Sequence, residues 1–562
     1  MSAVRANPKP AAPAASPACD FDLVIVGAGF GGLYMLHRAR QRGLKVRLFE
    51  AAGGVGGTWW WNRYPGARVD IESFEYSFAF DDALQQEWQW SERYAAQPEL
   101  LRYLNHVADR FGLRPDMQFD TRVNAARFDE AAGVWDLEVG DGQRVRTRYC
   151  AMATGLLSAP HKPPIPGLDT FKGEQYQTSY WPHHEVDFTG KRVAVIGTGS
   201  SAIQSIPVIA RQAKHLTVFQ RTPNFSIPLR NCPMDREIEK RIKADYKKWR
   251  EMEFNSFGGF ISVNYEPYGF NPKAALEVSA QERRAEYERR WASGGLCFYL
   301  AFTDLLFNRE ANETLAEFVR EKIRERVKDP AVAELLVPQG YPILTKRLCA
   351  DTGYYETFNR DNVTLVSIKD TPIEKITPTG IVVAGREYPV DAIVFATGFD
   401  AVTGALNKID IRGRGGAALK DQWRNGPRTS VGIMSAGFPN LFFVNGPGSP
   451  AAFFQPVLLA EYQGDWILDC IGYLDRNGKR TIEATESAAE EFVKHSAEIA
   501  GSTLFGLSNN WYMGANIPGK TRVMLMYLGG FPAYRDQCVA AAANGYGKFV
   551  LDGTAAGQAV AA

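Results

Sequence analysis

Two glycine-rich segments constrain the fold of this chain more than any other feature. The first, at 27–32, reads GAGFGG, and the second, at 197–202, reads GTGSSA. Each follows an apolar run typical of a buried strand and precedes a helical pattern. Glycines in that position let the backbone turn tightly and approach the pyrophosphate of a dinucleotide at a helix N-terminus. We therefore predict an α/β fold with two Rossmann-like dinucleotide-binding domains.

The strand that follows the first glycine-rich segment ends in an acid. Strands are predicted at 21–26 and 44–49, and Glu50 comes directly after the second of them. A carboxylate there can accept hydrogen bonds from both ribose hydroxyls and repels a 2′-phosphate, so this site suits FAD or NAD. The alternative is a tight loop that binds no ligand, but strand, helix and terminal acid together favour a nucleotide site.

The corresponding strand after the second glycine-rich segment ends in a base. Strands are predicted at 192–196 and 216–220, and Arg221 and Thr222 follow. A guanidinium and a hydroxyl suit the 2′-phosphate of NADP, because both can form strong hydrogen bonds to it. The alternative is a solvated arginine at a strand end. Two different dinucleotides on one chain would allow electron transfer between them.

Composition narrows the class of protein further. At 562 residues the chain should form two to four domains, and its net charge of +1 points to neither nucleic acid nor an acidic partner. No two of the seven cysteines have the spacing of a redox pair or a zinc knuckle, so we expect reduced thiols, no metal site and a cytoplasmic protein. No apolar run is long enough for a transmembrane helix.

The order of the segments predicts interleaved domains. Two Ala-Thr-Gly turns, at 153–155 and 396–398, mark where the chain would leave the first nucleotide-binding domain and return to it. The sequence between about 234 and 337 has densely charged helical periodicity, which predicts a helical insertion. Further strands are predicted at 363–366, 381–383 and 392–395. The predicted division is a disordered N-terminal extension (1–19), an FAD-binding domain (20–157 and 395–549), an NADP-binding domain (158–233 and 338–394), the helical insertion (234–337) and a C-terminal tail (550–562).

Five other segments resemble the type I Baeyer–Villiger monooxygenases, and the resemblance runs from about Asp22 to about Phe549. The segments are GGVGGTWWWNRYPGARVD at 53–70, FKGEQYQTSYWP at 171–182, TKR at 345–347, GPGSP at 446–450 and WYMGANIPGK at 511–520. The resemblance implies that NADPH reduces FAD, that the reduced flavin captures O2 as a C(4a)-peroxide, and that NADP+ stays bound. The peroxide would attack a ketone, and the Criegee-type adduct would rearrange to an ester or lactone, with sulfides as a second substrate class.

Arg347 and Asp70 correspond to the catalytic pair of that family. A peroxyanion is a localised negative charge, and a fixed guanidinium in a water-poor pocket stabilises it and the oxyanion that follows. A buried arginine needs a partner, and the resemblance identifies that partner as Asp70. Without the resemblance both would be interpreted as surface charges, because charged residues are mostly exposed.

The resemblance also implies cofactor and substrate contacts. Lys346 would join Arg221 and Thr222 at the 2′-phosphate, and Trp511, in a predicted loop, would close over NADP+ and substrate unless it is a core indole. The expected cofactor contacts are Gly27, Gly29, Gly32, Glu50, Gly57, Thr58, Trp59, Asp70, Tyr76, Gly197, Gly199, Ser200, Ser201, Gln204, Arg221, Thr222, Lys346, Arg347 and Trp511. The expected apolar wall for a hydrophobic ketone is Ala451, Ala452, Phe453 and Trp511, with Phe454 beside Phe453; the alternative is that the two phenylalanines belong to the core.

One position departs from the family pattern. The family fingerprint F-x-G-x-x-x-H-x-x-x-W is matched at Phe171, Gly173 and Trp181, but Gln177 occupies the histidine position. Glutamine forms hydrogen bonds but does not titrate. We interpret Gln177 as a hydrogen-bonding strut between the linker and the NADP-binding domain; the alternative is that the substitution has abolished activity.

Three other functions compete with this interpretation. A disulfide reductase also has two nucleotide sites, but it needs a cysteine pair beside the flavin, which the sequence lacks. A flavin N- or S-monooxygenase would share both glycine-rich segments but not the Trp-rich segment, Asp70 or Arg347. A non-catalytic nucleotide sensor would have no use for that charged pair. We expect the enzyme to be a monomer whose partners are a ketone and O2.

Overall fold

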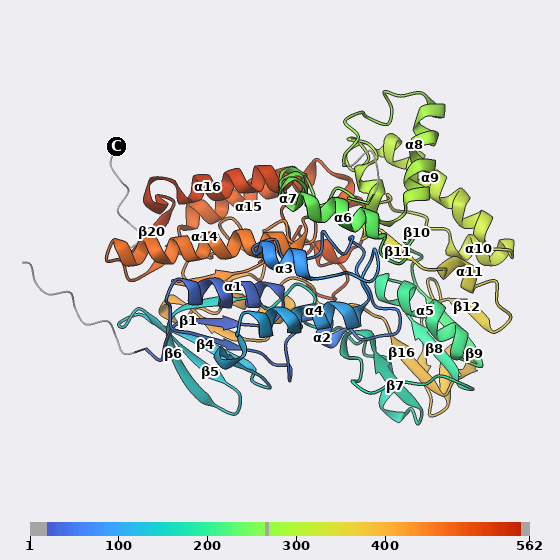
Figure 1. Cartoon of the computed structure of the whole chain (residues 1–562). Helices are drawn as coiled ribbons and strands as arrows, with labels where there is room; N and C mark the ends of the chain where they lie inside the picture. The colour runs from blue at the N-terminus through green and yellow to red at the C-terminus, as the bar shows by residue number, and fades with distance from the viewer. Residues whose placement is uncertain (1–18, 265–268, 552–562) are drawn as a thin grey trace, which may run out of the picture.

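The computed structural model describes residues 19–264 and 269–551 and places each glycine-rich segment at the end of a strand in its own large sheet (Figure 1). Apart from Cys19, the predicted disordered extension lies outside the described residues. The same holds for most of the predicted C-terminal tail. Its first two residues, Val550 and Leu551, belong instead to strand β20 (Phe549–Leu551), which pairs with β19 (Ile482–Ala484).

The first sheet has eight strands and is built around the first glycine-rich segment. Its strand β1 (Phe21–Val26) is parallel to β2 (Val46–Phe49) on one side and to β6 (Gln143–Met152) on the other. The last four residues of β1 are buried, as expected of a parallel strand covered on both faces. The other strands are β3 (Met117–Gln118), β4 (Val123–Asp129), β5 (Val134–Val139), β17 (Asp410–Arg412) and β18 (Leu441–Phe443). Because β17 and β18 come from late in the chain, two distant segments complete this sheet.

The second sheet has five parallel strands in the order β12-β9-β8-β16-β7. They are β7 (Glu174–Gln177), β8 (Arg192–Ile196), β9 (His215–Gln220), β12 (Val363–Ser367) and β16 (Ala392–Phe395). An antiparallel ribbon of β13 (Lys375–Ile376), β14 (Gly380–Val383) and β15 (Arg386–Pro389) adjoins it in sequence. The strands predicted at 21–26, 192–196 and 392–395 are confirmed at both ends, whereas β2 begins two residues later than predicted.

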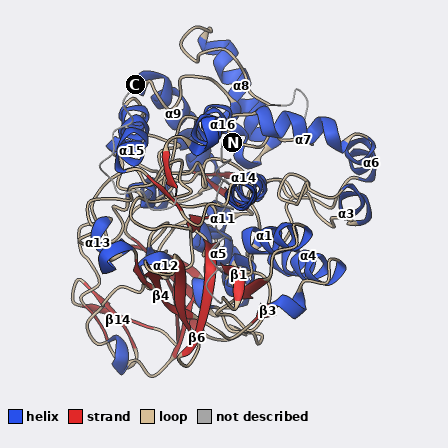
Figure 2. Cartoon of the chain, turned by 90° about the vertical axis from the view of Figure 1, so that its left-hand side faces the viewer, coloured by secondary structure: helices blue, strands red, loops and turns tan. Residues whose placement is uncertain are grey.

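A helix begins within each glycine-rich segment, and helices cover the sheets. Helix α1 (Phe30–Gln41) begins inside the first segment, and α5 (Ser200–Gln212) begins inside the second. In Figures 1 and 2, α14 (Pro456–Arg476), α15 (Glu486–Gly501) and α16 (Phe531–Tyr546) lie over the first sheet, and α14 packs on α1. Other helices are α4 (Gln97–Arg110) and the short α2 (Thr58–Trp61), α3 (Asp82–Glu87), α11 (Tyr354–Thr357), α12 (Gly404–Asn407) and α13 (Leu419–Gln422). Among the described helices, none has the length and apolar character needed to cross a membrane.

The helical segment between the two halves of the second sheet belongs to two cores. From β10 (Ser226–Pro228) to β11 (Cys349–Asp351) the described residues form helices and loops without a strand. The helices are α6 (Arg236–Ala244), α7 (Tyr246–Asn255), α8 (Ala280–Ser293), α9 (Arg309–Arg326) and α10 (Pro330–Leu336). Ile242 and Trp249 of α6 and α7 join the core beneath the first sheet, whereas Tyr287 and Phe318 of α8 and α9 join that of the second. The segment therefore links the two sheets.

Candidate active site

The first glycine-rich segment forms an open turn between β1 and α1. Gly27 has a φ of +108°, and a Cβ there would lie 2.5 Å from the carbonyl oxygen of Ala153. A Cβ on Gly32 would lie 1.8 Å from the oxygen of Gly27, so neither position tolerates a side chain. Gly29 is the N-cap of α1, has no side-chain cap, and would bring its Cβ near only Gly57. The first turn of α1 therefore offers free N–H groups to an anion.

Glu50 lies at the carboxyl end of β2, beside that turn. One carboxylate oxygen accepts from the backbone N–H of Ala28 at 2.6 Å, and the other accepts from that of Ala52 at 2.8 Å. Burial raises the pKa of Glu50, and the backbone hydrogen bonds oppose this rise. Each oxygen keeps a further lone pair, so the carboxylate can also accept hydrogen bonds from ribose hydroxyls.

The Trp-rich segment contributes a second wall to the same turn. Gly57 has a φ of +51° and packs so closely on the first glycine-rich segment that a Cβ would lie 2.8 Å from a Cα there. Thr58 and Trp59 begin α2, and the Trp59 ring lies 5.9 Å from that of Tyr76 in an edge-on arrangement. Gly57, Thr58 and Trp59 of this segment therefore lie beside the turn, and Tyr76 packs against Trp59. Closely packed glycine backbones leave room for a pyrophosphate, and the adjacent aromatic rings suit the flat ring system of a dinucleotide.

The second glycine-rich segment repeats this geometry. Gly197 has a φ of +111°, and its Cβ would lie 2.5 Å from the carbonyl oxygen of Ala396. Gly27 stands in the same relation to Ala153, so each Ala-Thr-Gly turn passes over the first glycine of its own segment. Gly199 is the N-cap of α5 and has open space where a Cβ would stand, with Ser200 and Ser201 in the first turn behind it.

Gln204 links the second nucleotide turn to the segment that carries Asp70. Its side-chain oxygen accepts from the Tyr64 hydroxyl at 2.8 Å, and its side-chain nitrogen donates to the carbonyl oxygen of Arg68 at 3.1 Å. Both ends of the amide therefore bind protein groups. In this structure Gln204 therefore holds the backbone at Arg68, two residues before Asp70.

Two cations lie close together at the end of β9. The Lys346 ammonium lies 4.3 Å from the centre of the Tyr341 ring. Burial and the positive charge of Arg221 lower the pKa of Lys346 to about 8. Thr222 follows Arg221 and accepts a hydrogen bond from Thr198 at its carbonyl oxygen, 2.8 Å away. Like charges held side by side favour the binding of an anion between them.

Arg347 and Asp70 form a two-bond ion pair. The Nε and Nη2 groups of Arg347 donate to the two carboxylate oxygens of Asp70, each at 2.8 Å. The third nitrogen, Nη1, donates to the carbonyl oxygen of Ala452 at 3.3 Å. Burial acts to lower the pKa of Arg347, but the charge and hydrogen bonds of Asp70 raise it above its usual range. The guanidinium therefore stays charged with its plane fixed, while its side chain remains 23% exposed.

Trp511 begins a short 3₁₀ helix, η7 (Trp511–Met513), so the prediction of a plain loop was wrong at this point. The Asn510 side chain accepts from the N–H of Met513 at 2.9 Å and so stabilises the turn. Further along, Asn516 donates to the carbonyl oxygen of Phe399 at 2.7 Å. The segment at 511–520 is thereby held against the second Ala-Thr-Gly crossing.

The expected substrate wall divides into exposed and core residues. Ala451 is fully buried, whereas Ala452 and Phe453 are partly exposed. The Phe453 ring lies 4.6 Å from that of Tyr512. Phe454 is 2% exposed and stacks on Phe531 at 4.0 Å, so it belongs to the core. Of the two adjacent phenylalanines, only Phe453 can contact a ligand.

Comparison with known proteins identifies the family. A model for the pyridine nucleotide-disulphide oxidoreductases matches residues 21–250. A Baeyer–Villiger monooxygenase of Pseudooceanicola batsensis is 42% identical over 543 residues, which cover 95% of this chain and 97% of that protein. The chain belongs to the Baeyer–Villiger monooxygenase family. All seven cysteines of this family member are free, so none is engaged in the disulfide that a disulfide reductase would use.

Two further relatives show the breadth of the similarity. The solved structure of an oxidized steroid monooxygenase bound to NADP is 50% identical, with a TM-score of 0.89, and the match covers 94% of this chain and 99% of that one. A phenazine N-monooxygenase of Lysobacter antibioticus is 40% identical and is matched over 94% of this chain and 97% of its own length. Family membership confirms the predicted fold class, the flavoprotein monooxygenase activity, and FAD and NADP as cofactors.

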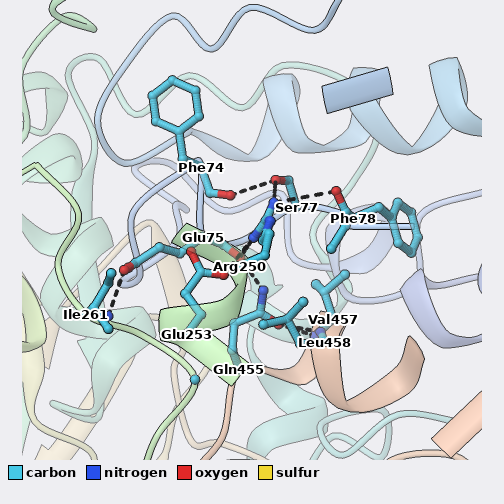
Figure 3. Close-up of polar contacts among 12 residues, drawn as sticks. Phe74, Glu75, Ser77, Phe78, Arg250, Glu253, Ile261, Gln455, Val457 and Leu458 are labelled. Carbon is cyan, nitrogen blue, oxygen red and sulfur yellow. Dashed lines mark hydrogen bonds and ion pairs between the residues drawn. The ribbon is translucent and has the colours of Figure 1, made fainter. Parts of the chain in front are cut away.

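A buried polar network surrounds Glu75 and Gln455 in this Baeyer–Villiger monooxygenase (Figure 3). Gln455 donates through its side chain to the carbonyl oxygen of Glu75, and its side-chain oxygen accepts from Leu458 at 2.8 Å at the start of α14. The Glu75 carboxylate accepts from the N–H of Ile261 at 2.8 Å. The network thus joins the segment that ends at Phe454 to the segment next to Tyr76.

Gln177 does not form the predicted strut through its side-chain nitrogen. It is the last residue of β7 and lies opposite Phe395 of β16 in the parallel ladder. Its Nε2 is buried and has no hydrogen-bond partner within the part of the chain that the structure describes. The backbone of β16 is occupied by sheet hydrogen bonds on both sides, from β7 and β8. The prediction of a hydrogen-bonding strut was therefore wrong for this atom.

Sequence reasoning missed three tyrosines of the site. Tyr64 holds Gln204, and the hydroxyl of Tyr299 accepts from the N–H of Leu348 at 3.4 Å, next to Arg347. Tyr512 packs between Trp511 and Phe453. Tyr64 lies in the family segment at 53–70 and Tyr512 in the one at 511–520, so the motifs around them already pointed to these two positions. Tyr299 lies in the helical segment, where no motif pointed to it.

Proposed function

We propose that this enzyme converts a hydrophobic ketone, NADPH, a proton and O2 into an ester or lactone, NADP+ and water. The observation that carries the proposal is the two-bond Arg347–Asp70 pair, with both contacts at 2.8 Å. The pair holds a permanent positive charge at the point where Asp70, in the loop after α2, meets Arg347, just before β11. Such a charge stabilises negative charge that develops on the substrate's oxygen.

We assign FAD to the turn between β1 and α1. Gly27, Gly29 and Gly32 would let the pyrophosphate approach the N-terminus of α1, and Glu50 would accept the ribose hydroxyls. Gly57, Thr58, Trp59 and Tyr76 would line the same turn. Bound there, FAD would supply the reducing and oxygen-activating chemistry, which no amino-acid side chain of the site can supply.

We assign NADPH to the turn between β8 and α5. Gly197, Gly199, Ser200 and Ser201 would bind the pyrophosphate at the N-terminus of α5. The adjacent cations Arg221 and Lys346, with the hydroxyl of Thr222, would bind the 2′-phosphate. Trp511 would pack over the nicotinamide half and the substrate.

The substrate class follows from the residues beside Arg347. Phe453 is flanked by Tyr512 at 4.6 Å and Phe505 at 5.1 Å between ring centres, and Trp511 follows at the end of this row. Aromatic walls favour apolar ligands, and one charged group fixes the orientation of a ligand oxygen. A ketone with a large apolar body satisfies both requirements, and the steroid monooxygenase relative is consistent with such a substrate.

The test is a panel of cyclic, linear and aromatic ketones incubated with the FAD-loaded enzyme, NADPH and O2. We expect ester or lactone, with NADPH consumed in proportion, for the apolar members. The control is the same mixture with NADH, which should react poorly. Consumption of NADPH with hydrogen peroxide as the only product from every ketone would contradict the proposal.

A second candidate is oxidation of nitrogen or sulfur. The phenazine N-monooxygenase relative favours it. That protein is 40% identical and matches 94% of this chain, so a similar sequence is named for oxidation of a nitrogen atom. Adding an aryl methyl sulfide and a phenazine to the panel separates the alternatives. N-oxide or sulfoxide without any ester would make this the main activity.

We also propose a cytoplasmic monomer. The seven free cysteines support a reducing compartment, and five of them are buried. Size-exclusion chromatography with light scattering tests the oligomeric state, for which we expect the mass of one chain. A stable dimer would contradict that part of the proposal.

A further inference from the structure

The aromatic ring of Tyr341 lies against the Lys346 ammonium, at the edge of the proposed 2′-phosphate site. The ammonium nitrogen is 4.3 Å from the centre of the ring. The two residues flank a tight turn, which Thr345 closes by donating from its hydroxyl to the carbonyl oxygen of Pro342 at 2.6 Å. An aromatic face attracts a cation electrostatically, so the ring gives the ammonium a preferred place.

The hydroxyl of Tyr341 anchors this ring to the segment that follows Arg221. It donates to the carbonyl oxygen of Pro223 at 2.8 Å, and the side-chain oxygen of Asn224 is a second acceptor at 3.3 Å. The ring also packs edge-on against that of Phe225, with 5.5 Å between the ring centres. The position of the ring is therefore fixed relative to the end of β9.

The same hydrogen bonds reach the second glycine-rich segment, to which Thr198 belongs. The side-chain nitrogen of Asn224 donates to the carbonyl oxygen of Thr198 at 2.8 Å. The Thr198 hydroxyl donates to the carbonyl oxygen of Thr222, also at 2.8 Å. Tyr341 thus connects Lys346 to the turn between β8 and α5, where we place the pyrophosphate.

The two cations of this site are not neutralised by the protein. Among the residues that the structure describes, neither Lys346 nor Arg221 pairs with a carboxylate. Burial and the charge of Arg221 both lower the pKa of Lys346. A lysine ammonium sits on a flexible four-carbon stem, so repulsion alone would let it move away from the guanidinium. The ring of Tyr341 opposes that movement.

We propose that Tyr341 is a positioning residue that holds the Lys346 ammonium beside Arg221 and so contributes to the selection of NADPH over NADH. The inference rests on the proposed function, because it needs the 2′-phosphate to bind between these two cations. A phosphate that meets an ammonium already in place binds more tightly, since less free energy is lost in ordering the lysine side chain.

The experiment separates the ring from its hydroxyl and measures binding rather than turnover. Tyr341→Leu removes both groups, and Tyr341→Phe removes the hydroxyl alone. We expect the Kd of NADP+ for the FAD-loaded enzyme, measured by calorimetry, to rise about 10-fold in Tyr341→Leu and about threefold in Tyr341→Phe. The Kd of NAD+ should stay unchanged in both variants, because NAD+ has no 2′-phosphate.

A double variant tests whether Tyr341 acts through Lys346. In Lys346→Ala there is no ammonium to hold, so adding Tyr341→Leu should not raise the Kd of NADP+ further. Two independent effects would multiply instead. A residue with a purely structural role would show no such dependence on Lys346.

The matched control is Tyr388→Leu. Tyr388 also lies against a cation, with 4.8 Å from its ring centre to the Arg386 guanidinium carbon, and also packs edge-on against a phenylalanine, Phe219, at 5.5 Å. It lies in the antiparallel ribbon, on β15. This variant should lower Tm to a similar extent and leave the Kd of NADP+ unchanged.

Three outcomes would overturn the inference: wild-type affinity for NADP+ in both Tyr341 variants, equal losses for NADP+ and NAD+, or multiplied losses in the double variant. If Tyr341→Leu does not fold, Tyr341→Phe decides through a loss confined to NADP+ or no loss. If Lys346→Ala binds NADP+ as the wild type does, the proposed 2′-phosphate site fails together with this inference. If Lys346→Ala weakens NADP+ alone and the Tyr341 variants do not, the proposed site stands and only this inference fails.

Discussion

At the scale of single residues, the site depends on charges brought together from distant parts of the chain. Asp70 and Arg347 lie 277 positions apart in the sequence, yet two hydrogen bonds of 2.8 Å join them. The paired carboxylate fixes the guanidinium plane and compensates for its desolvation. Asp70 is thus a positioning residue, and Arg347 is the group that can touch the reacting oxygen.

Replacing Arg347 with alanine should separate reduction from oxygenation. NADPH oxidation needs no positive charge at this position. Oxygenation does need one, because negative charge develops on the substrate's oxygen. We expect Arg347→Ala to consume NADPH at a rate within a few-fold of wild type and to lose ester formation by at least about 100-fold, or about 3 kcal/mol. Product analysis by gas chromatography measures the loss. Arg424→Ala, at a side chain that is 75% exposed, is the control, and full ester yield from Arg347→Ala would refute the assignment.

Lys346 should make coenzyme selection depend on pH. Its pKa is lowered to about 8, so the free enzyme loses this positive charge as pH rises through about 8. A 2′-phosphate binds better to the charged form, and the apparent KM for NADPH should therefore rise above pH 8. Lys346→Ala should raise that KM at every pH and flatten the profile, while KM for NADH stays unchanged.

The matched variant for this position is Lys346→Arg, which keeps the charge at high pH. It should hold the KM for NADPH constant across the same pH range. Equal losses with NADPH and NADH in Lys346→Ala would show that the lysine acts elsewhere than at the 2′-phosphate.

Sequence reasoning reached these residues unevenly, for a physical reason. Glu50 and Arg221 could be predicted because a strand end and its glycine turn lie close in sequence. Nothing local places Arg347 beside Asp70 or Lys346 beside Arg221, and the family resemblance alone suggested both. Tyr299 could not be predicted as a site residue, because its helical segment has no motif and its contact is with a backbone N–H.

At the scale of elements, buried parallel strands were predicted best. β1, β8 and β16 have continuous apolar runs with turns at their ends, and both of their limits were predicted correctly. The short strands β3 and β17 carry no comparable pattern, because pairing with neighbours defines them. The helical segment was recognised, but its periodicity could not reveal that α6–α7 and α8–α9 pack in different cores.

Helix α7 is docked through a buried carboxylate that should make stability depend on pH. Glu253 is 2% exposed and pairs with Arg250 at 2.8 Å, and Arg250 also donates to the hydroxyl of Ser77 at 2.7 Å. Burial raises the pKa of Glu253 to about 7, against the opposing effect of Arg250. A carboxyl with a raised pKa is more protonated in the folded than in the unfolded protein. Its contribution is therefore present at low pH and lost as pH rises from about 4.5 to about 7.

Glu253→Gln should remove that dependence. Because glutamine resembles the protonated acid, variant and wild type should be similarly stable near pH 4.5, and the variant should be more stable by up to about 3 kcal/mol at pH 8. Urea unfolding at the two pH values measures the difference. Exposed Glu237, with 82% of its side chain accessible, provides the control variant Glu237→Gln. A variant that is less stable than wild type at pH 8 would contradict the assigned titration.

At the scale of the whole molecule, two nucleotide turns of the same construction lie in separate sheets. Gly27 meets Ala153, and Gly197 meets Ala396, with the same 2.5 Å spacing to a virtual Cβ. Gln204 and the Arg347–Asp70 pair connect segments of the two sheets directly. The predicted domain boundaries stay a prediction. Because β17 and β18 return to the first sheet, the structure supports a discontinuous first nucleotide-binding domain.

Gln177 lies close to the second Ala-Thr-Gly turn and should affect coupling rather than the reaction type. Its unpaired Nε2 lies on β7, opposite Phe395, which directly precedes the second Ala-Thr-Gly turn. We expect Gln177→His to keep ester formation and to change the ratio of ester to hydrogen peroxide, or its pH dependence, because histidine titrates near neutral pH. Both products are measured against NADPH consumed between pH 6 and 9. Ester from the histidine variant alone would mean that Gln177 disables the natural enzyme.

The measurement that tests the account most directly is oxygen labelling. Wild-type enzyme with FAD, NADPH, an apolar ketone and ¹⁸O2 should give an ester with one labelled oxygen per molecule, located in the single-bonded position, and one NADPH consumed per ester. Arg347→Ala should consume NADPH and give labelled hydrogen peroxide instead. An unlabelled ester, or labelled peroxide as the only product of the wild-type enzyme with every ketone, would contradict the assignment of this chain as a ketone-oxygenating enzyme.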